Sequence, residues 1–218
     1  KPKQKTEPRI LLLPDKSAST DKITEYLFCR GIDYAIIQYC IDKGLIFESL
    51  PYHNVVFVGY DEKKEPKYAA YRSTNKRRIM GDCSGSKKDY SFRLGKENLE
   101  EVHLFECAID LLSYATLEKM AGRDWRKDNL VSLAIDLLSY ATLAKLNGQD
   151  WKEMSFVSLS GVYSPAKKIE DSKVPIALEK YLGSNPSVRK IRIHFDNDIA
   201  GRKAAQTLKT ILPDKYEI

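Results

Sequence analysis

The chain lacks the features that define several large classes of protein. Its 218 residues contain no apolar run near the roughly 20 residues that a membrane-spanning helix needs, and the charged segment Lys1–Lys5 has no apolar signal core. The four cysteines are widely spaced, and no pair has the C-x-x-C spacing that would bring two thiolates to one zinc ion. We therefore expect a cytoplasmic protein with reduced thiols and no membrane partner, read as a piece of a longer chain because it opens without Met.

The positive charge is unevenly distributed. The chain carries a net charge of +6, and its 43% hydrophobic and 30% charged residues are ordinary for a globular protein. Residues 1–95 hold 18 Lys and Arg against 12 Asp and Glu, whereas residues 96–218 hold 18 of each kind. A basic first half suits an anionic partner, because Lys and Arg displace counterions from a phosphate backbone.

The first half has the pattern of a linker followed by a small α+β domain. Residues 1–16 are basic and proline-containing, as linkers often are. Within residues 17–95, a helix is expected up to Cys29, ended by Gly31, and a second one over Tyr34–Asp42. Three β-rich stretches follow and predict a meander: 45–48, 54–60 and 68–72.

From residue 102 the pattern changes to alternating strands and helices. Strands are expected at 102–105, 130–133, 156–159 and 188–195, with helices from Ala108, near 175–182 and over 199–212. This alternation predicts an α/β domain over residues 102–218, with a mainly parallel sheet and helices on both faces.

A tandem repeat lies inside this second half. Residues 108–133 and 134–159 align without gaps, and 17 of the 26 positions are identical. Two units are too few for a solenoid, so the pattern indicates a helix–strand segment duplicated, naturally or by engineering, within a fold that needs one copy. Either copy can occupy the native position. If the first does, Glu106 precedes the helix in place; if the second does, Glu106 is displaced.

Acidic residues follow two of the expected strands. Glu106 comes directly after 102–105, and Asp196 and Asp198 come at the end of the strand 188–195. The carboxyl ends of parallel strands form one edge of a sheet, where open α/β sheets bind ligands. A cluster of carboxylates at that edge suits Mg²⁺, which prefers oxygen ligands and keeps several waters.

These motifs resemble the TOPRIM family of primases, topoisomerases and nucleases. The first reads VHLFECAID from Val102 to Asp110, and the second reads HFDNDIAG from His194 to Gly201. The resemblance implies that Glu106 is the general acid/base or a metal ligand. It implies that Asp196, Asp198 and Asp110 hold Mg²⁺ or Mn²⁺. The family often has Gly after the Glu, where this chain has Cys107, so the activity is less firmly implied than the fold.

The first half resembles a domain of unknown function that precedes TOPRIM domains in primase-like proteins of mobile elements. The resemblance is carried by YLFCRGI at 26–32, VVFVGYD at 55–61 and GDCSGSK at 81–87. Six basic residues of this region are candidates for contact with nucleic acid, the alternative being a solvated basic face: Arg72, Lys76, Arg77, Arg78, Lys87 and Lys88.

Together these patterns predict a primase-like nucleotidyltransferase, if it is active, whose partners are DNA or RNA and nucleoside triphosphates. Two alternatives stay open. One is a TOPRIM-type nuclease that nicks the backbone. The other is a non-catalytic nucleic-acid-binding module or the product of an engineered duplication.

Overall fold

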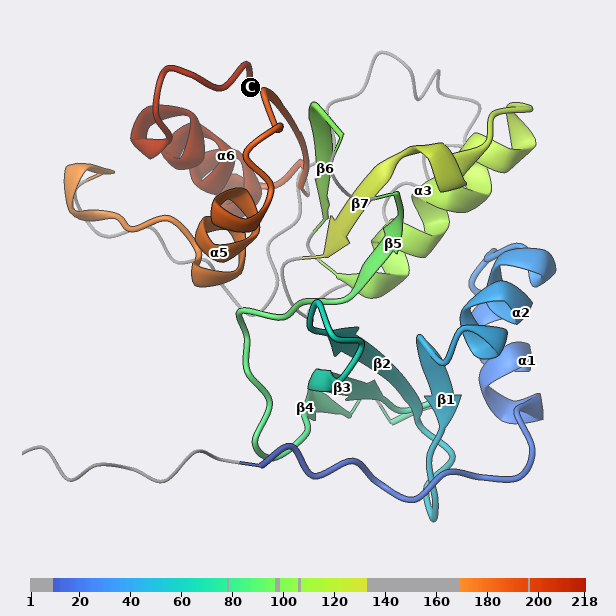
Figure 1. Cartoon of the computed structure of the whole chain (residues 1–218). Helices are drawn as coiled ribbons and strands as arrows, with labels where there is room; N and C mark the ends of the chain where they lie inside the picture. Colours follow the sequence, from blue (N-terminus) through green and yellow to red (C-terminus); the bar gives the residue numbers. More distant parts are fainter. Residues whose placement is uncertain (1–9, 78, 97–98, 106, 133–168, 196) are drawn as a thin grey trace, which may run out of the picture.

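The computed structural model describes residues 10–77, 79–96, 99–105, 107–132, 169–195 and 197–218. Within these ranges the chain forms two four-stranded sheets, one from the first half and one from the second (Figure 1). The expected α/β architecture with a small upstream α+β region is confirmed. None of the helices in the described ranges is long and apolar enough to cross a membrane.

The first half begins with two helices, α1 (Asp21–Cys29) and α2 (Tyr34–Asp42). Asp33 caps α2 by accepting a hydrogen bond from the Ala35 amide at 2.9 Å. Gly31 and Gly44 follow the two helices with φ of 82° and 67°, a conformation that glycine adopts without strain. Both helices end where the sequence predicts.

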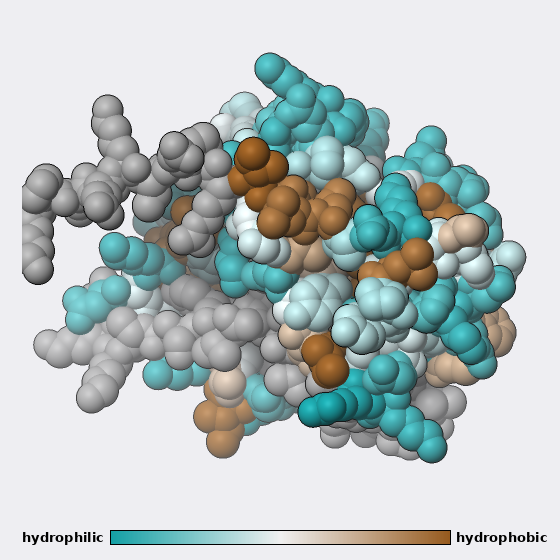
Figure 2. Space-filling model, turned by 90° about the horizontal axis from the view of Figure 1, so that it is seen from below, coloured by the Kyte–Doolittle hydropathy of each residue, from teal (hydrophilic) through white to brown (hydrophobic). Residues whose placement is uncertain are grey.

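An antiparallel meander completes the first half. Its strands are β1 (Ile46–Glu48), β2 (Val55–Tyr60), β3 (Pro66–Arg72) and β4 (Met80–Asp82), and they lie in chain order in the sheet. The short β4 was not predicted. Residues 10–16, expected to be part of a linker, lie along this sheet, where the Leu12 amide donates to the Ser84 carbonyl at 2.8 Å and Lys16 bridges to Ser49. Figure 2 views this side of the molecule, on which hydrophobic residues form separate patches among hydrophilic ones.

The second sheet has the order β5-β7-β6-β8, from β5 (Arg93–Gly95), β7 (Asn129–Ser132), β6 (Glu101–Phe105) and β8 (Lys190–His194). Strands β7, β6 and β8 are parallel, whereas the unpredicted edge strand β5 is antiparallel to β7. The second copy of the repeat and its expected strand 156–159 lie outside the described residues.

Alternate residues of β6 face opposite layers. Val102 and Leu104 pack with α5 (Ile176–Ser184) and α6 (Ile199–Ile211), whereas Phe105 packs in the core that includes α3 (Ala108–Met120). Two short 3-10 helices, η1 (Trp125–Lys127) and η3 (Ile169–Asp171), complete the described elements. Helices therefore cover both faces of the second sheet, as the strand–helix alternation predicts.

The two halves share one core. A single hydrophobic cluster contains residues of α1, α2, β1 and β2 together with residues of α3 and of the second sheet. Phe57 of β2 meets Phe92 edge-on at 5.7 Å between ring centroids. Gly59 lets β2 approach the chain before β5, since a Cβ there would lie 2.1 Å from the Tyr90 carbonyl oxygen. The halves are thus packed together rather than joined by a free linker.

Candidate metal and nucleic-acid site

The carboxyl edge of the second sheet is where the sequence predicts the acidic site. Strands β6 and β8 are neighbours in parallel register, with Phe105 opposite His194. Glu106 follows Phe105 in the chain, and Asp196 comes two residues after His194. Both acidic residues lie outside the described residues. The strands that precede them, β6 and β8, end side by side.

Asp198 caps α6 at this edge. Its Oδ1 accepts a hydrogen bond from the Gly201 amide at 2.7 Å, and the side chain is exposed. A carboxylate at a helix N-terminus is stabilised there by the helix dipole. Arg202, one turn into α6, donates to the carbonyl and side-chain oxygens of Asn197 at 2.8 and 3.0 Å. The turn carrying the predicted metal ligand is therefore held from both sides.

Asp110 lies in the first turn of α3, next to Cys107. The Cys107 thiol is buried and donates a hydrogen bond to Asp110 Oδ2 at 3.1 Å. Burial, together with the adjacent Asp110 carboxylate, raises the pKa of the Cys107 thiol well above its usual range. The Cys that replaces the family's Gly is thus a neutral hydrogen-bond donor directed at a predicted metal ligand, which sequence reasoning missed.

Arg72 connects the first half to this edge. It ends β3, is only 3% exposed, and its positive charge acts on Cys107, opposing the rise in the pKa of that thiol that burial causes. Arg72 is therefore not part of a solvated basic surface. It is a buried cation from the first half, close to the start of α3.

The other predicted nucleic-acid contacts lie in two separate groups. Lys76 and Arg77 are exposed in the loop that follows Arg72, whereas Arg78 lies outside the described residues. Lys87 and Lys88 are exposed as well. They lie near the opposite end of β3, where the Lys87 amide donates to the Lys67 carbonyl. Lys88 is also paired with Asp82 at 2.9 Å. The described candidates do not form one continuous patch.

A histidine pair joins β6 and β8 behind the edge. His103 Nδ1 and His194 Nε2 are 2.9 Å apart, and His103 Nε2 lies 3.2 Å from Glu101 Oε1. Burial, with the nearby charges of His103 and Arg192, lowers the pKa of His194 to about 3, so the pair is neutral near pH 7. His194 lies within the strand expected at 188–195, but the sequence gave no signal of this cross-strand partner.

Whether these residues suit a divalent cation follows from their donor atoms. The predicted ligands are all carboxylates, and Asp198 keeps one oxygen free of hydrogen bonds within the described part of the chain. Among the described residues, no group of three His, Cys, Asp or Glu side chains is close enough to hold a metal. Two of the four predicted ligands, Glu106 and Asp196, are outside that set. The donor set therefore fits Mg²⁺ or Mn²⁺ in kind.

The first copy of the repeat forms α3 and β7, which lie next to β6. This arrangement is the one expected if the first copy occupies the native position. The distance that would test it, from Glu106 to Asp196, lies outside the described residues, so the choice between the copies stays a prediction.

Comparisons with known proteins match both halves of the chain. Residues 25–98 match the family described as "Protein of unknown function (DUF3991)", and residues 130–217 match the family described as "Toprim-like". The second match begins after α3; it contains Asp196 and Asp198 but neither Glu106 nor Asp110. No curated protein matches the chain.

Among solved structures, the chain is similar to the primase fragment of the bacteriophage T7 primase-helicase protein. The two share 19% identity with a TM-score of 0.51, over 100% of this chain and 72% of that one. A DNA primase domain from Pseudomonas aeruginosa aligns with 83% of this chain and 49% of its own, at 15% identity and a TM-score of 0.41. At this identity the T7 fragment supports the fold. The chain thus carries a Toprim-like domain preceded by a DUF3991 domain.

Proposed function

We propose that this chain is a primase-like module that joins nucleotides on a nucleic acid template, with a divalent cation at the carboxyl edge of the second sheet. The observation that carries the proposal is the parallel register of β6 and β8. It ends both strands at one edge, from which the chain continues into the two acidic motifs. Similarity of the fold to the primase fragment of the T7 primase-helicase protein agrees with this choice.

In the proposed site, Asp110, Asp196 and Asp198 would hold the cation, beside Glu106. When bound, Mg²⁺ neutralises phosphate charge and lowers the pKa of a hydroxyl that it contacts. Phosphoryl transfer depends mainly on positioning and charge neutralisation, so a few well-placed carboxylates are sufficient.

The side chains around the edge have distinct tasks in this proposal. Asp198 keeps its orientation because Oδ1 is fixed by the Gly201 amide, which leaves Oδ2 for a ligand. The Cys107 thiol donates to Oδ2 of Asp110 and so fixes the orientation of that carboxylate. Glu106 acts as the general base that accepts the proton of the attacking hydroxyl.

The first half supplies the positive charge. Arg72 places a buried cation near the start of α3, which offsets repulsion among the carboxylates and attracts phosphate. Lys76 and Arg77 extend this charge along the loop after β3, where a template strand would pass.

The test is a primer-synthesis assay with Mg²⁺, nucleoside triphosphates and a single-stranded template. Wild type should make primers, and Glu106→Gln should lose at least about 100-fold in rate, since it removes a carboxylate that acts on the reacting groups. Mg²⁺ should raise the melting temperature of wild type but not of Asp196→Asn. Nicking of the template without primer synthesis would contradict this proposal and favour the nuclease. Binding with neither activity would leave only a nucleic-acid-binding module.

A further inference from the structure

A cavity of about 640 Å³ lies between the two halves, away from the acidic edge. Its walls come from the end of α2, from β2 and the hairpin after it, and from β5 and the start of β7. A volume in this range is typical of sites for small molecules. Since both halves line it, anything bound there would contact both.

Asn129 lines the cavity and is only 2% exposed. Its Oδ1 accepts a hydrogen bond from the Tyr181 hydroxyl at 2.6 Å. Its Nδ2 is buried and has no hydrogen-bond partner within the described part of the chain. A buried donor without an acceptor costs about 1–3 kcal/mol, so this amide favours any ligand that brings an acceptor atom to it.

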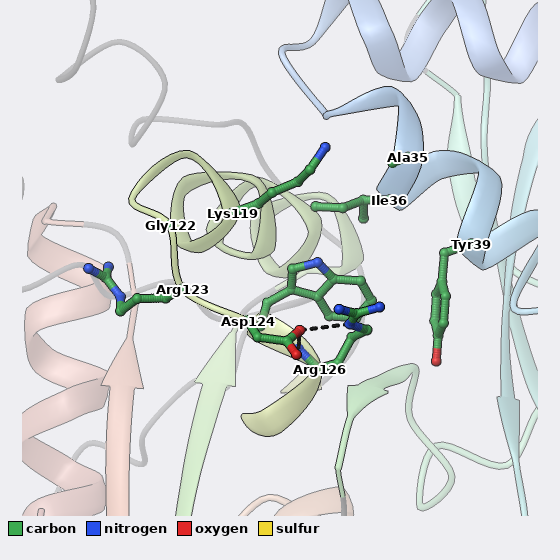
Figure 3. Close-up of a pocket in the computed structure, with 9 residues that line it drawn as sticks. Ala35, Ile36, Tyr39, Lys119, Gly122, Arg123, Asp124 and Arg126 are labelled. Carbon is green, nitrogen blue, oxygen red and sulfur yellow. Dashed lines mark hydrogen bonds and ion pairs between the residues drawn. The ribbon is translucent and has the colours of Figure 1, made fainter.

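Two tyrosines give the cavity fixed aromatic walls. The Tyr60 hydroxyl donates to the Gly44 carbonyl at 2.7 Å. Tyr39 meets Trp125 edge-on, with ring centroids 5.1 Å apart. Tyr39 also lines a smaller pocket (Figure 3), so it borders both hollows. Rings held in place in this way suit contact with a planar aromatic group.

The charged lining consists of Lys43, Lys64 and Arg93, against Asp61 and Glu62. The Arg93 guanidinium already lies over the Tyr181 ring, 5.0 Å from its centroid, so the available cations are the two lysines. The Asp61 carboxylate is already used, because it accepts hydrogen bonds from the Lys63 and Glu65 amides at 2.9 Å each and pairs with Lys67. The charge left for a ligand is therefore positive, which favours a phosphate.

We propose that this cavity is a second site that binds a nucleoside phosphate. The base lies against the tyrosines with an acceptor atom facing Asn129 Nδ2, and the phosphate lies near Lys43 and Lys64. The site differs from the acidic edge in position. Asn129 opens β7, about 10 Å along the strand from its carboxyl end, and Tyr60 lies at the end of the β2–β3 hairpin opposite Arg72.

The proposal is tested by calorimetric titration of the whole chain with AMP, adenosine and inorganic phosphate in EDTA, which keeps metal from the carboxylates. Wild type should bind AMP, and should bind adenosine and phosphate each at least tenfold more weakly. Lys43→Glu/Lys64→Glu should weaken AMP binding at least tenfold. The charge-matched control Lys203→Glu/Lys209→Glu, on exposed positions of α6, should not.

A second pair isolates the buried amide. Tyr181→Phe removes the hydroxyl that donates to Asn129 Oδ1. Asn129→Ala in that background then removes the Nδ2 donor without leaving the Tyr181 hydroxyl buried and without its acceptor. AMP binding should fall at least fivefold between these two variants, while Asp198→Asn binds as wild type does. No AMP binding by wild type at millimolar concentration would overturn the proposal. So would binding that Asp198→Asn abolishes and the lysine variants leave intact. Neither result bears on the proposed primer synthesis, whose cation and catalytic carboxylate lie at the acidic edge.

Discussion

Two carboxylates, one in each half of the molecule, accept hydrogen bonds from backbone amides at the start of a helix, but they differ in burial. Glu48 in the first half accepts hydrogen bonds from the Lys22 and Ile23 amides at the start of α1 and contacts His53 through its other oxygen at 2.5 Å. Asp198 in the second half accepts one bond from the start of α6. Glu48 is 1% exposed, whereas Asp198 is exposed.

Within the described part of the chain, both oxygens of Glu48 have hydrogen-bond partners, whereas only Oδ1 of Asp198 does. Glu48 thus stabilises the structure of the first half, while Oδ2 of Asp198 is the oxygen that the proposed site assigns to the cation. Substitutions should separate these tasks: changes in the first half should alter stability, and changes at the edge of the second should alter activity.

The largest expected effect is on activity. Asp198→Asn keeps an oxygen that can accept from the Gly201 amide, so the melting temperature should stay close to that of wild type. Loss of a charged metal ligand should lower primer synthesis by about 100-fold or more. Parallel measurement of initial rate and thermal melting checks this. A large loss of stability with unchanged rate would show that Asp198 is only a helix cap.

The next effect concerns the junction of the halves. Gly59→Ala should cost about 2–3 kcal/mol in unfolding free energy, because the new Cβ would lie 2.1 Å from a carbonyl oxygen of the neighbouring backbone. Gly183→Ala, in α5 with nothing within 4 Å of its Cβ, is the matched control and should stabilise by up to about 1 kcal/mol. Urea denaturation of both variants measures the contrast; equal effects would contradict it.

A smaller loss is expected for Glu48→Gln, about 1–2 kcal/mol. The amide keeps an acceptor for the start of α1 but loses the negative charge that strengthens those bonds. Denaturation curves should show this loss while primer synthesis per folded molecule is unchanged. A rate that fell with stability intact would place Glu48 in the functional machinery and remove the contrast with Asp198.

The smallest effect depends on pH. Burial, with the nearby Glu118 charge, raises the pKa of Asp128 to about 6. The folded state therefore holds the proton more tightly than the unfolded state, and stability from this group falls as pH rises from about 4 to 6. Asp128→Asn should remove that fall and gain less than about 1 kcal/mol at pH 7.5, since Asp128 is partly exposed. Melting temperatures at pH 4 and 7.5 test it; the same difference at both pH values would contradict it.

Sequence patterns predicted the helices well because their signals are local: Gly31 ends α1 and Asp33 begins α2. The strand–helix rhythm likewise predicted the parallel sheet. The short strands β4 (MGD) and β5 (RLG) were missed, since each contains a glycine and only one apolar residue, whereas the equally short β1 (IFE) contains two strand-favouring apolar residues.

The site was predictable only as a set of acidic residues after strands. The burial of Arg72, the thiol bond from Cys107 and the cavity at Asn129 all arise from packing between segments far apart in the chain. Nothing in the local sequence around these residues indicates such contacts. Arg72 has basic neighbours in the sequence, which do not indicate that β3 ends inside the molecule and that its side chain is buried there.

The register of β6 with β8 has a consequence for how the chain acquires its structure. Val102 pairs with Ile191, 89 residues later, whereas neighbouring strands of the first sheet pair across much shorter stretches. Closing so long a loop costs entropy before any contact rewards it, so the first sheet should form early and the second late. During synthesis on a ribosome, β6 can pair with β8 only after β8 has emerged, so we expect the acidic edge to form late.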